Sequence, residues 1–201
     1  TRLPSKILKK IGNVTLLDIH LQRIKRSKLI NELLVATTNE SNVEAIVNIA
    51  KNNMVSYYQG SLNNVLERFY LGAKQHNADI IVRLTSDCPL IDPDVIDNVI
   101  NTFLNNVCDY ASNTMEPSFP DGLDVEVFTF SALERAYNEA TLQSDKEHVT
   151  PYIWRNSTFK GGNIFKSVNY FSEIDYSNYR LTVDNYDDYK ITKEVYEKLD
   201  Y

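Results

Sequence analysis

Residues 82–93, VRLTSDCPLIDP, decide how the chain is expected to fold. An apolar run typical of a β-strand stops at Asp87, a turn around Pro89 follows, and Asp92 and Pro93 are residue types that begin a helix. A strand that leads directly into a helix is the unit from which parallel α/β sheets are built. Asp87 then stands at the carboxyl end of a strand, which is where open α/β sheets bind their ligands.

The sequence before and after this stretch repeats the alternation of strand and helix. Strand-like runs at 33–38, 54–60 and 79–85 alternate with helical periods at 41–53, 62–77 and 92–105, and Ser61 suits the N-cap of the second helix. We therefore predict an α/β fold with a mostly parallel, doubly wound sheet that carries helices on both faces.

The pattern changes after residue 108. Residues 109–113 form a short strand-like run, 123–130 alternate as an antiparallel strand does, and Ser131 and Glu134 fit a capping box at the start of a helix over 131–140. Residues 161–171 and 179–184 are strand-like, and a closing helix is expected from about Asp187. These segments predict a small antiparallel part within one domain, 1–201.

Composition excludes several classes of protein. The chain has 201 residues, 43% of them hydrophobic, and a net charge of −6, which argues against a nucleic-acid binder because such proteins need a basic face. No apolar run reaches the roughly 18 residues of a membrane span. Cys88 and Cys108 do not have the spacing of a metal-binding pair, so we expect a reduced, cytoplasmic protein.

A second aspartate, Asp184 in RLTVDNYDD, also follows a strand-like run. Two carboxylates delivered to one crevice by different strand ends would form an oxygen-only site, which suits Mg²⁺ shared with substrate phosphates. The alternative is structural: Asp87 would be a turn or cap acid, and Asp184 the cap of the last helix.

Six segments carry a resemblance to a known family. They are TRLPSK, LLVATTN, RLTSDCPLIDP, DGLDVEVF, EHVTPYI and LTVDNYDD, in that order along the chain. Together they resemble the cytidylyltransferases of the spore-coat polysaccharide type, which are related to the enzymes that activate acylneuraminate and 3-deoxy-manno-octulosonate as CMP-sugars. The resemblance implies a nucleotide-diphospho-sugar transferase fold, CTP and a sugar or sugar acid as substrates, Mg²⁺ as cofactor, and a homodimer.

The resemblance also implies a role for the first residues of the chain. The family's triphosphate loop has the form Ala-Arg-x-x-Ser-x-Arg-Leu-Pro-x-Lys, whose last part matches Arg2, Leu3, Pro4 and Lys6. The first strand, the first arginine and the serine are expected upstream of Thr1. By this resemblance Arg2 and Lys6 hold the triphosphate and act in catalysis with Asp87, whereas the alternative for both is a solvated basic terminus.

The same comparison makes Asp87 and Asp184 the two Mg²⁺ ligands. The second segment reads VDNYDD here, so the family's Thr-Pro is missing, which weakens Asp188 as a functional residue more than Asp184. Thr182 stands where some relatives carry a further acid.

Candidates for substrate recognition fall into two sets. The nucleotide side is expected to use Thr37, Thr38, Arg68 and Arg83, for which strand-end hydroxyls and surface ion pairs are the alternatives. The sugar side, in the half after residue 108, is expected to use Asp121, Asp124, Glu126, Glu147 and His148. His20 and His76 lie in amphipathic helices and are expected at the surface or its boundary.

The reaction implied by the resemblance is the attack of a sugar hydroxyl on the α-phosphorus of CTP, with pyrophosphate as leaving group, for surface polysaccharide synthesis. The pattern identifies no general base. Residues 1–108 would form the nucleotide-binding half, and 109–201 the sugar-binding half with a dimer surface. A glycosyltransferase of the same fold and a non-catalytic nucleotide-binding subunit are the alternatives, because a fold alone does not establish an activity.

Overall fold

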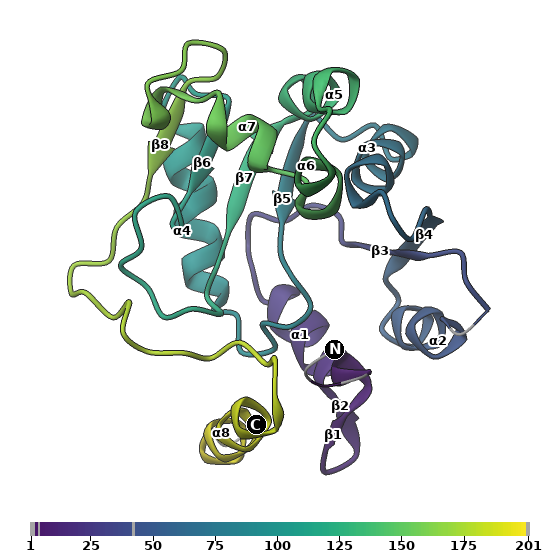
Figure 1. Ribbon diagram of the computed structural model, residues 1–201. Helices are drawn as coiled ribbons and strands as arrows, with labels where there is room; N and C mark the ends of the chain where they lie inside the picture. The colour runs from purple at the N-terminus through teal and green to yellow at the C-terminus, as the bar shows by residue number, and fades with distance from the viewer. Residues whose placement is uncertain (1–2, 4, 42, 200–201) are drawn as a thin grey trace.

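The computed structural model describes residues 3, 5–41 and 43–199 (Figure 1). Its first part comprises the 3-10 helix η1 (Lys6–Leu8), the hairpin strands β1 (Lys10–Ile11) and β2 (Val14–Thr15), and helix α1 (Leu16–Ile24). The alternating part comprises β3 (Leu34–Thr38), α2 (Glu44–Asn52), β4 (Ser56–Gly60), α3 (Val65–Gln75), β5 (Ile80–Arg83) and α4 (Pro93–Leu104). The last part comprises β6 (Tyr110–Ser112), β7 (Glu126–Thr129), α5 (Phe130–Glu139), α6 (Gln143–His148), α7 (Pro151–Arg155), η2 (Thr158–Lys160), β8 (Ser167–Asn169) and α8 (Tyr186–Lys198).

The strands form an α/β arrangement with both parallel and antiparallel pairs, which confirms the predicted class. β3 and β4 are parallel, whereas the larger sheet has the order β5-β7-β6-β8. In that sheet β7 is antiparallel to both β5 and β6, and β6 is parallel to β8. The antiparallel strand thus lies inside the sheet rather than at its margin, which the order of segments along the chain could not reveal.

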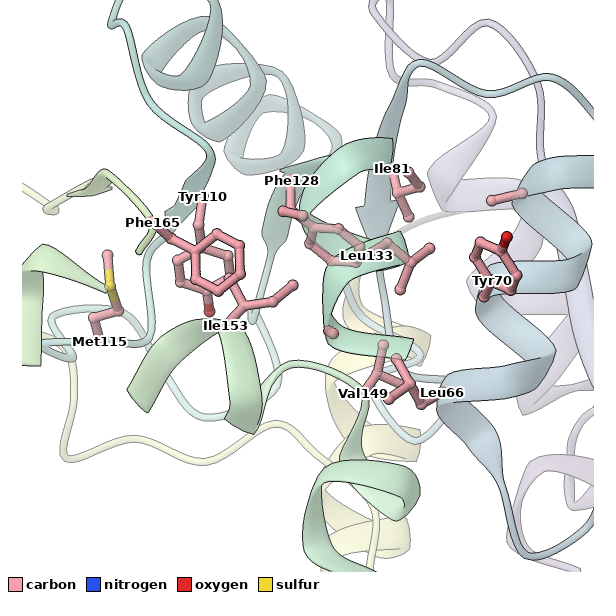
Figure 2. Packing of buried hydrophobic residues seen from close by; sticks show 13 residues of the cluster. Leu66, Tyr70, Ile81, Tyr110, Met115, Phe128, Leu133, Val149, Ile153 and Phe165 are labelled. Atoms are coloured by element: carbon pink, nitrogen blue, oxygen red, sulfur yellow. The ribbon is translucent and has the colours of Figure 1, made fainter. Parts of the chain in front are cut away.

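Alternating side chains of the central strands explain why helices cover both faces of the larger sheet. Tyr110 and Phe128 are paired across β6 and β7 and pack with α3, α5 and α7 (Figure 2). Their neighbours Ala111 and Val127 are paired as well and face the opposite way, toward α4. All four side chains are buried, so the sheet carries a hydrophobic core on each side.

The helix starts test the predicted caps. Asp92 caps α4, accepting from the backbone N–H of Asp94 at 2.8 Å, and Pro93 is the first helical residue, as predicted. The prediction for Ser61 was wrong, because α3 begins three residues later, where Asn64 accepts from the N–H of Glu67. The capping box at Ser131 was also wrong, since Thr129 caps α5 and Ser131 already lies inside the helix.

Two strand predictions in the second half were too long. Of 161–171 only Ser167–Asn169 forms a strand, β8. Residues 179–184 form no strand and pair with the rest of the molecule through one isolated bridge between Asp121 and Arg180. Within the described residues, no helix combines the length and apolar character needed to cross a membrane.

Candidate active site

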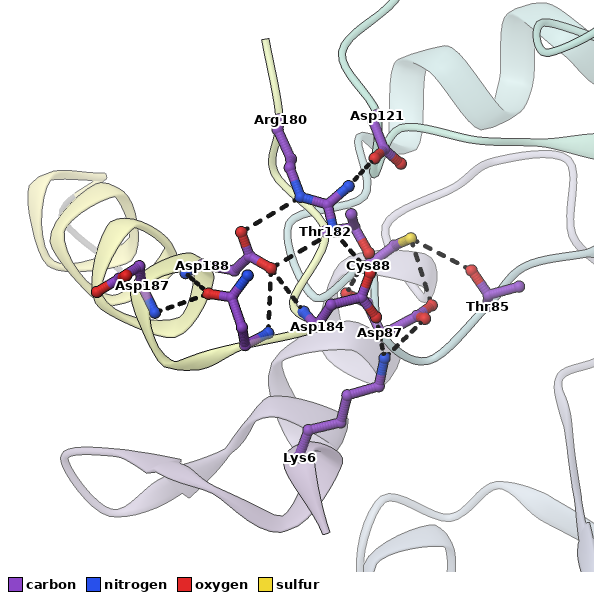
Figure 3. Close-up of polar contacts among 11 residues, drawn as sticks. Lys6, Thr85, Asp87, Cys88, Asp121, Arg180, Thr182, Asp184, Asp187 and Asp188 are labelled. Carbon is purple, nitrogen blue, oxygen red and sulfur yellow. Dashed lines mark hydrogen bonds and ion pairs between the residues drawn. The ribbon is translucent and has the colours of Figure 1, made fainter. Parts of the chain in front are cut away.

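Two carboxylates from distant parts of the sequence meet at one lysine. Asp87 lies in the turn after β5, and Asp184 lies immediately before α8 (Figure 3). The ammonium of Lys6, on η1, donates to Asp87 Oδ2 and to Asp184 Oδ1, each at 2.9 Å. Asp87 and Asp184 therefore lie close together, as the hypothesis of a shared site requires, and Lys6 joins them.

Hydrogen bonds to the backbone hold the turn that carries Asp87. Its carbonyl oxygen accepts from the N–H of Val183 at 2.8 Å and from the hydroxyl of Thr182 at 3.2 Å. Because Val183 and Thr182 directly precede Asp184, these two bonds fix the spacing of the two carboxyl-bearing segments. Thr182 thus has a structural contact in this chain.

Two side chains of helix α1 contact the backbone of the segment that follows Asp87. His20 Nδ1 lies 2.8 Å from the carbonyl oxygen of Cys88, and Arg23 Nε donates to that of Ile91 at 2.7 Å. Because a carbonyl oxygen only accepts, Nδ1 of His20 carries the proton. Burial lowers the pKa of His20 to about 4, so the ring is neutral at physiological pH. The expectation that His20 lies at the surface was wrong.

A second network holds Asp184. The Arg180 guanidinium donates to Asp184 Oδ2 at 2.6 Å, to Asp188 at 3.2 Å and to Asp121 (Figure 3). Asp188 also accepts from the backbone N–H groups of Asp184 and Asn185, completing the capping box of α8. Asp188 therefore stabilises the start of the helix and orients Arg180, and Arg180 orients Asp184.

Neighbouring groups stabilise the charged forms of Asp87, Asp184 and Lys6. Burial raises the pKa of Asp87, but hydrogen bonds from Lys6 and Thr85 outweigh it and the net pKa is lowered. Hydrogen bonds from Lys6 and Arg180 lower the pKa of Asp184. Burial lowers the pKa of Lys6, but the two carboxylates more than offset this and raise it. Both acids are therefore ionised and Lys6 is protonated at neutral pH.

The segment 121–124 reaches the centre through a glycine that no other residue could replace without strain. Gly122 has φ +110°, and a Cβ there would lie 2.5 Å from the backbone nitrogen of Thr182. This close approach lets the carbonyl of Asp121 accept from the N–H groups of Leu181 and Thr182.

A pocket of about 270 Å³ lies next to Asp87, because Thr85, which hydrogen-bonds to the Asp87 carboxylate, also lines the pocket. It is lined by Arg83, Thr85, Thr114, Asp124, Glu126, His148 and Thr150. Glu126 accepts from the Tyr110 hydroxyl at 2.7 Å and from Arg83, which neutralises it. Burial raises the pKa of Asp124 to about 6, helped by the charges of Asp121 and Glu126. The lining is polar and rich in hydroxyl groups, which suits a polyhydroxylated ligand.

An unusual backbone turn at Val149 places the residues on either side of it, His148 and Thr150, in the lining of the pocket. Val149 has φ 73° and ψ −56°, and the N–H of Thr150 donates to the carbonyl of His148 at 2.9 Å, which together define a γ-turn. A β-branched residue rarely adopts such angles. Val149 itself is buried in the core, whereas His148 and Thr150 on either side line the pocket.

Three of the predicted nucleotide-binding residues lie near one another. Thr37 and Thr38 end β3, and they are paired with Gln59 and Gly60 at the end of β4. The Arg68 side chain packs beside Gly60 and donates through Nη1 to the carbonyl of Ser61 at 3.0 Å. Its Nε is buried and has no hydrogen-bond partner among the described residues. A buried donor without a partner indicates a group that a ligand could satisfy.

The remaining predicted residues are distributed differently. Arg83, expected on the nucleotide side, lines the pocket with Asp124, Glu126 and His148. Asp121 belongs to the network around Arg180. Glu147 is exposed on α6 and does not line the pocket. Arg2 lies outside the described residues.

Sequence reasoning missed several residues of this region. Thr85, Thr114 and Thr150 line the pocket, and Arg180 and His20 hold the two carboxylate-bearing segments. Thr85 and Arg180 stand within motifs that had been singled out, so closeness to Asp87 and Asp184 could have indicated them. Thr114 and His20 lie in none of these motifs, so nothing in the sequence indicated them.

Comparisons with known proteins identify the family of the chain. The family described as cytidylyltransferase matches residues 1–200. A cytidylyltransferase structure from Leptospira borgpetersenii serovar Hardjo-bovis is 40% identical, with a TM-score of 0.92 over 98% of this chain and 82% of that one. The spore coat polysaccharide biosynthesis protein SpsF of Bacillus subtilis is 29% identical over 98% of this chain and 82% of its own length.

A more distant structure shares the fold. CMP:2-keto-3-deoxy-manno-octonic acid synthetase complexed with CTP is 13% identical, with a TM-score of 0.69 over 99% of this chain and 94% of that one. This supports the nucleotidyltransferase fold. The family match over nearly the whole chain and the close Leptospira structure go further: the chain belongs to the cytidylyltransferase family and is an enzyme of CTP-dependent nucleotidyl transfer to a sugar-like substrate.

Proposed function

We propose that the enzyme transfers CMP from CTP to a hydroxyl group of a sugar or sugar acid, with Mg²⁺ held by Asp87 and Asp184, for surface polysaccharide synthesis. The observation that carries this proposal is the convergence of the two carboxylates on Lys6, at 2.9 Å each, beside a polar pocket. The relatives named above act in polysaccharide synthesis or on a keto-sugar acid, which supports the acceptor class.

The two acids fit Mg²⁺ in chemistry and in number. Magnesium prefers oxygen ligands and is commonly bound by one or two carboxylates together with substrate phosphates. The described part of the chain contains no cluster of three or more acidic, histidine or cysteine ligands that could hold a metal by itself. Asp87 and Asp184 would hold the ion, which would neutralise charge on the triphosphate.

The protein's own groups would bind and orient both substrates. Lys6, with Arg2 in the undescribed part, would contact the triphosphate, and Thr37, Thr38 and Arg68 would contact the nucleoside. The acceptor would lie in the pocket with Asp124 placed to accept a hydrogen bond from one of its hydroxyl groups. Glu126 and His148 would contact the rest of the sugar.

The reaction is an in-line displacement. The acceptor oxygen forms a bond to the α-phosphorus as the bond from that phosphorus to the bridging oxygen breaks, and pyrophosphate leaves. The hydroxyl proton would pass to a base, for which the Asp124 carboxylate in the pocket lining is the candidate. Stabilising the charge that develops on pyrophosphate falls to cationic groups such as Lys6.

The test is pyrophosphate release with Mg²⁺, each of the four ribonucleoside triphosphates, and a panel of sugars and sugar acids. We expect release with CTP and one class of acceptor. Asp87→Asn and Asp184→Asn should each lose at least about a hundredfold in kcat. Asp187→Asn is the matched control, because Asp187 lies on the same helix end but is 85% exposed in its side chain. Near-normal turnover in either variant of the first pair would refute that residue's metal role.

A homodimer and a cytoplasmic location are part of the proposal. Residues 171–179 expose Phe171, Ile174, Tyr176 and Tyr179, and an exposed apolar surface of this kind is typical of a subunit contact. Light scattering should give a mass near twice that of one chain, and Ile174→Glu should reduce it. Cys88 and Cys108 are both free, in keeping with a reducing compartment.

A further inference from the structure

The position of Lys6 is unusual for a residue that is expected to bind phosphate. Its ammonium lies at 2.9 Å from one oxygen of each candidate metal ligand, Asp87 and Asp184 (Figure 3). The three side chains are each about one-third exposed or less, so the contact is partly shielded from water. A single positive charge therefore stands between the two carboxylates that would hold a divalent cation.

Two ionised carboxylates facing one point repel each other unless a cation lies between them. In the absence of metal, Lys6 supplies that cation. Mg²⁺ binds carboxylate oxygens at about 2.0–2.1 Å, so it cannot enter between these oxygens while the ammonium is there. The two acids use two of the three N–H donors of the ammonium, which leaves a single donor for a triphosphate.

We propose that Lys6 closes the metal site of the free enzyme and is displaced when a nucleotide arrives with its divalent cation, an inference that rests on the proposed function. The free enzyme then binds divalent cations weakly, and metal and nucleotide bind together. Displacement frees Lys6 to contact the phosphates that enter with the metal.

The surroundings allow Lys6 to move and Arg180 to stay. Lys6 sits on a three-residue 3-10 helix, and its long, flexible side chain carries the ammonium to the two acids. Arg180 is bound to three carboxylates, those of Asp121, Asp184 and Asp188. Asp184 thus remains oriented by Arg180 after Lys6 has left.

The experiment is a titration of the enzyme with Mn²⁺ alone, with free Mn²⁺ measured by electron paramagnetic resonance. Lys6→Gln and Lys6→Met both remove the charge, and Lys6→Met retains most of the apolar stem. We expect each to bind Mn²⁺ about tenfold or more tightly than the unmodified enzyme without nucleotide. Lys10→Gln is the matched control, because Lys10 is an exposed lysine four residues away, and it should leave Mn²⁺ binding unchanged.

Two further titrations make the result specific. Adding Asp87→Asn to Lys6→Gln should abolish the gain in Mn²⁺ affinity, and adding CTP should increase Mn²⁺ binding to the unmodified enzyme. The inference is overturned if the unmodified enzyme binds Mn²⁺ within about threefold of both Lys6 variants, or if Lys10→Gln gains as much as they do. Failure of the proposed function has a different signature, namely no CTP binding with or without Mn²⁺.

Discussion

Acidification should destabilise the enzyme through His20, which supports the turn that carries Asp87. The ring is 3% exposed, and burial lowers its pKa from 6.5 to about 4, although the Cys88 carbonyl and the charge of Asp87 act in the opposite direction. Below pH 6.5 the unfolded chain binds a proton at His20 that the folded chain does not bind until about pH 4. The contribution of His20 is therefore fully present above pH 6.5 and is lost as the pH falls toward 4.

The size of the effect follows from the two pKa values. A shift of one unit corresponds to about 1.4 kcal/mol, so the whole shift corresponds to about 3 kcal/mol. Between pH 7 and pH 5 the free energy of unfolding should fall by about 2 kcal/mol on this account alone. Asp124, with its raised pKa, titrates in the same range with the opposite sign, so the His20 contribution must be measured as a difference between variants.

The assay is urea denaturation at pH 5, 6 and 7, followed by the fluorescence of Trp154, the chain's one tryptophan. The comparison is with His20→Gln, whose amide can donate to the Cys88 carbonyl but does not titrate. The unmodified protein should lose about 2 kcal/mol more than His20→Gln between pH 7 and pH 5. Equal losses in the two proteins would refute the view that His20 is held neutral in the core.

Further substitutions test the turn at Val149, the close approach at Gly122 and the buried ion pair of Asp145 with Arg155. Val149→Gly should be at least as stable as Val149→Ala in thermal denaturation, the reverse of the usual order, because glycine relieves about 1–3 kcal/mol of strain at φ 73°; a normal order would argue against the strained γ-turn. Gly122→Ala should lower the free energy of unfolding by more than about 1 kcal/mol, since its Cβ would lie 2.5 Å from the Thr182 nitrogen; an unchanged urea midpoint would show that the backbone can separate there. Asp145→Asn should lower the free energy of unfolding by about 1–3 kcal/mol, because the fully buried carboxylate accepts two hydrogen bonds from Arg155, at 3.1 and 2.9 Å. Arg155→Lys should lower the free energy of unfolding by less.

The sequence allowed the prediction of those features that depend on neighbours in the chain. The start of α4 at Asp92 and Pro93 follows from cap chemistry, and Asp87 was placed by the rule that ligands bind at strand ends. Features that depend on distant partners were not predicted. The hydrophobic pattern of α1 shows which face is buried, but not that His20 on that face meets a carbonyl from residue 88. Strand β7 reads as antiparallel, but nothing local places it between β5 and β6.

Three positions break local rules, and two of them lie at the pocket. Val149 adopts a backbone conformation unfavourable for a β-branched residue, between two residues that line the pocket. Asp124 is a partly buried acid among other acids. Arg68, which packs beside Gly60, has a buried donor with no partner in the described part of the chain. None of these three features stabilises the fold, and each would become favourable with a ligand: a hydroxyl group for Asp124, an acceptor atom for Arg68, and a sugar held by the residues beside Val149. Asp124 and the turn at Val149 belong to the pocket that shares Thr85 with the surroundings of Asp87, so these two features argue for a substrate site independently of the resemblance to other proteins.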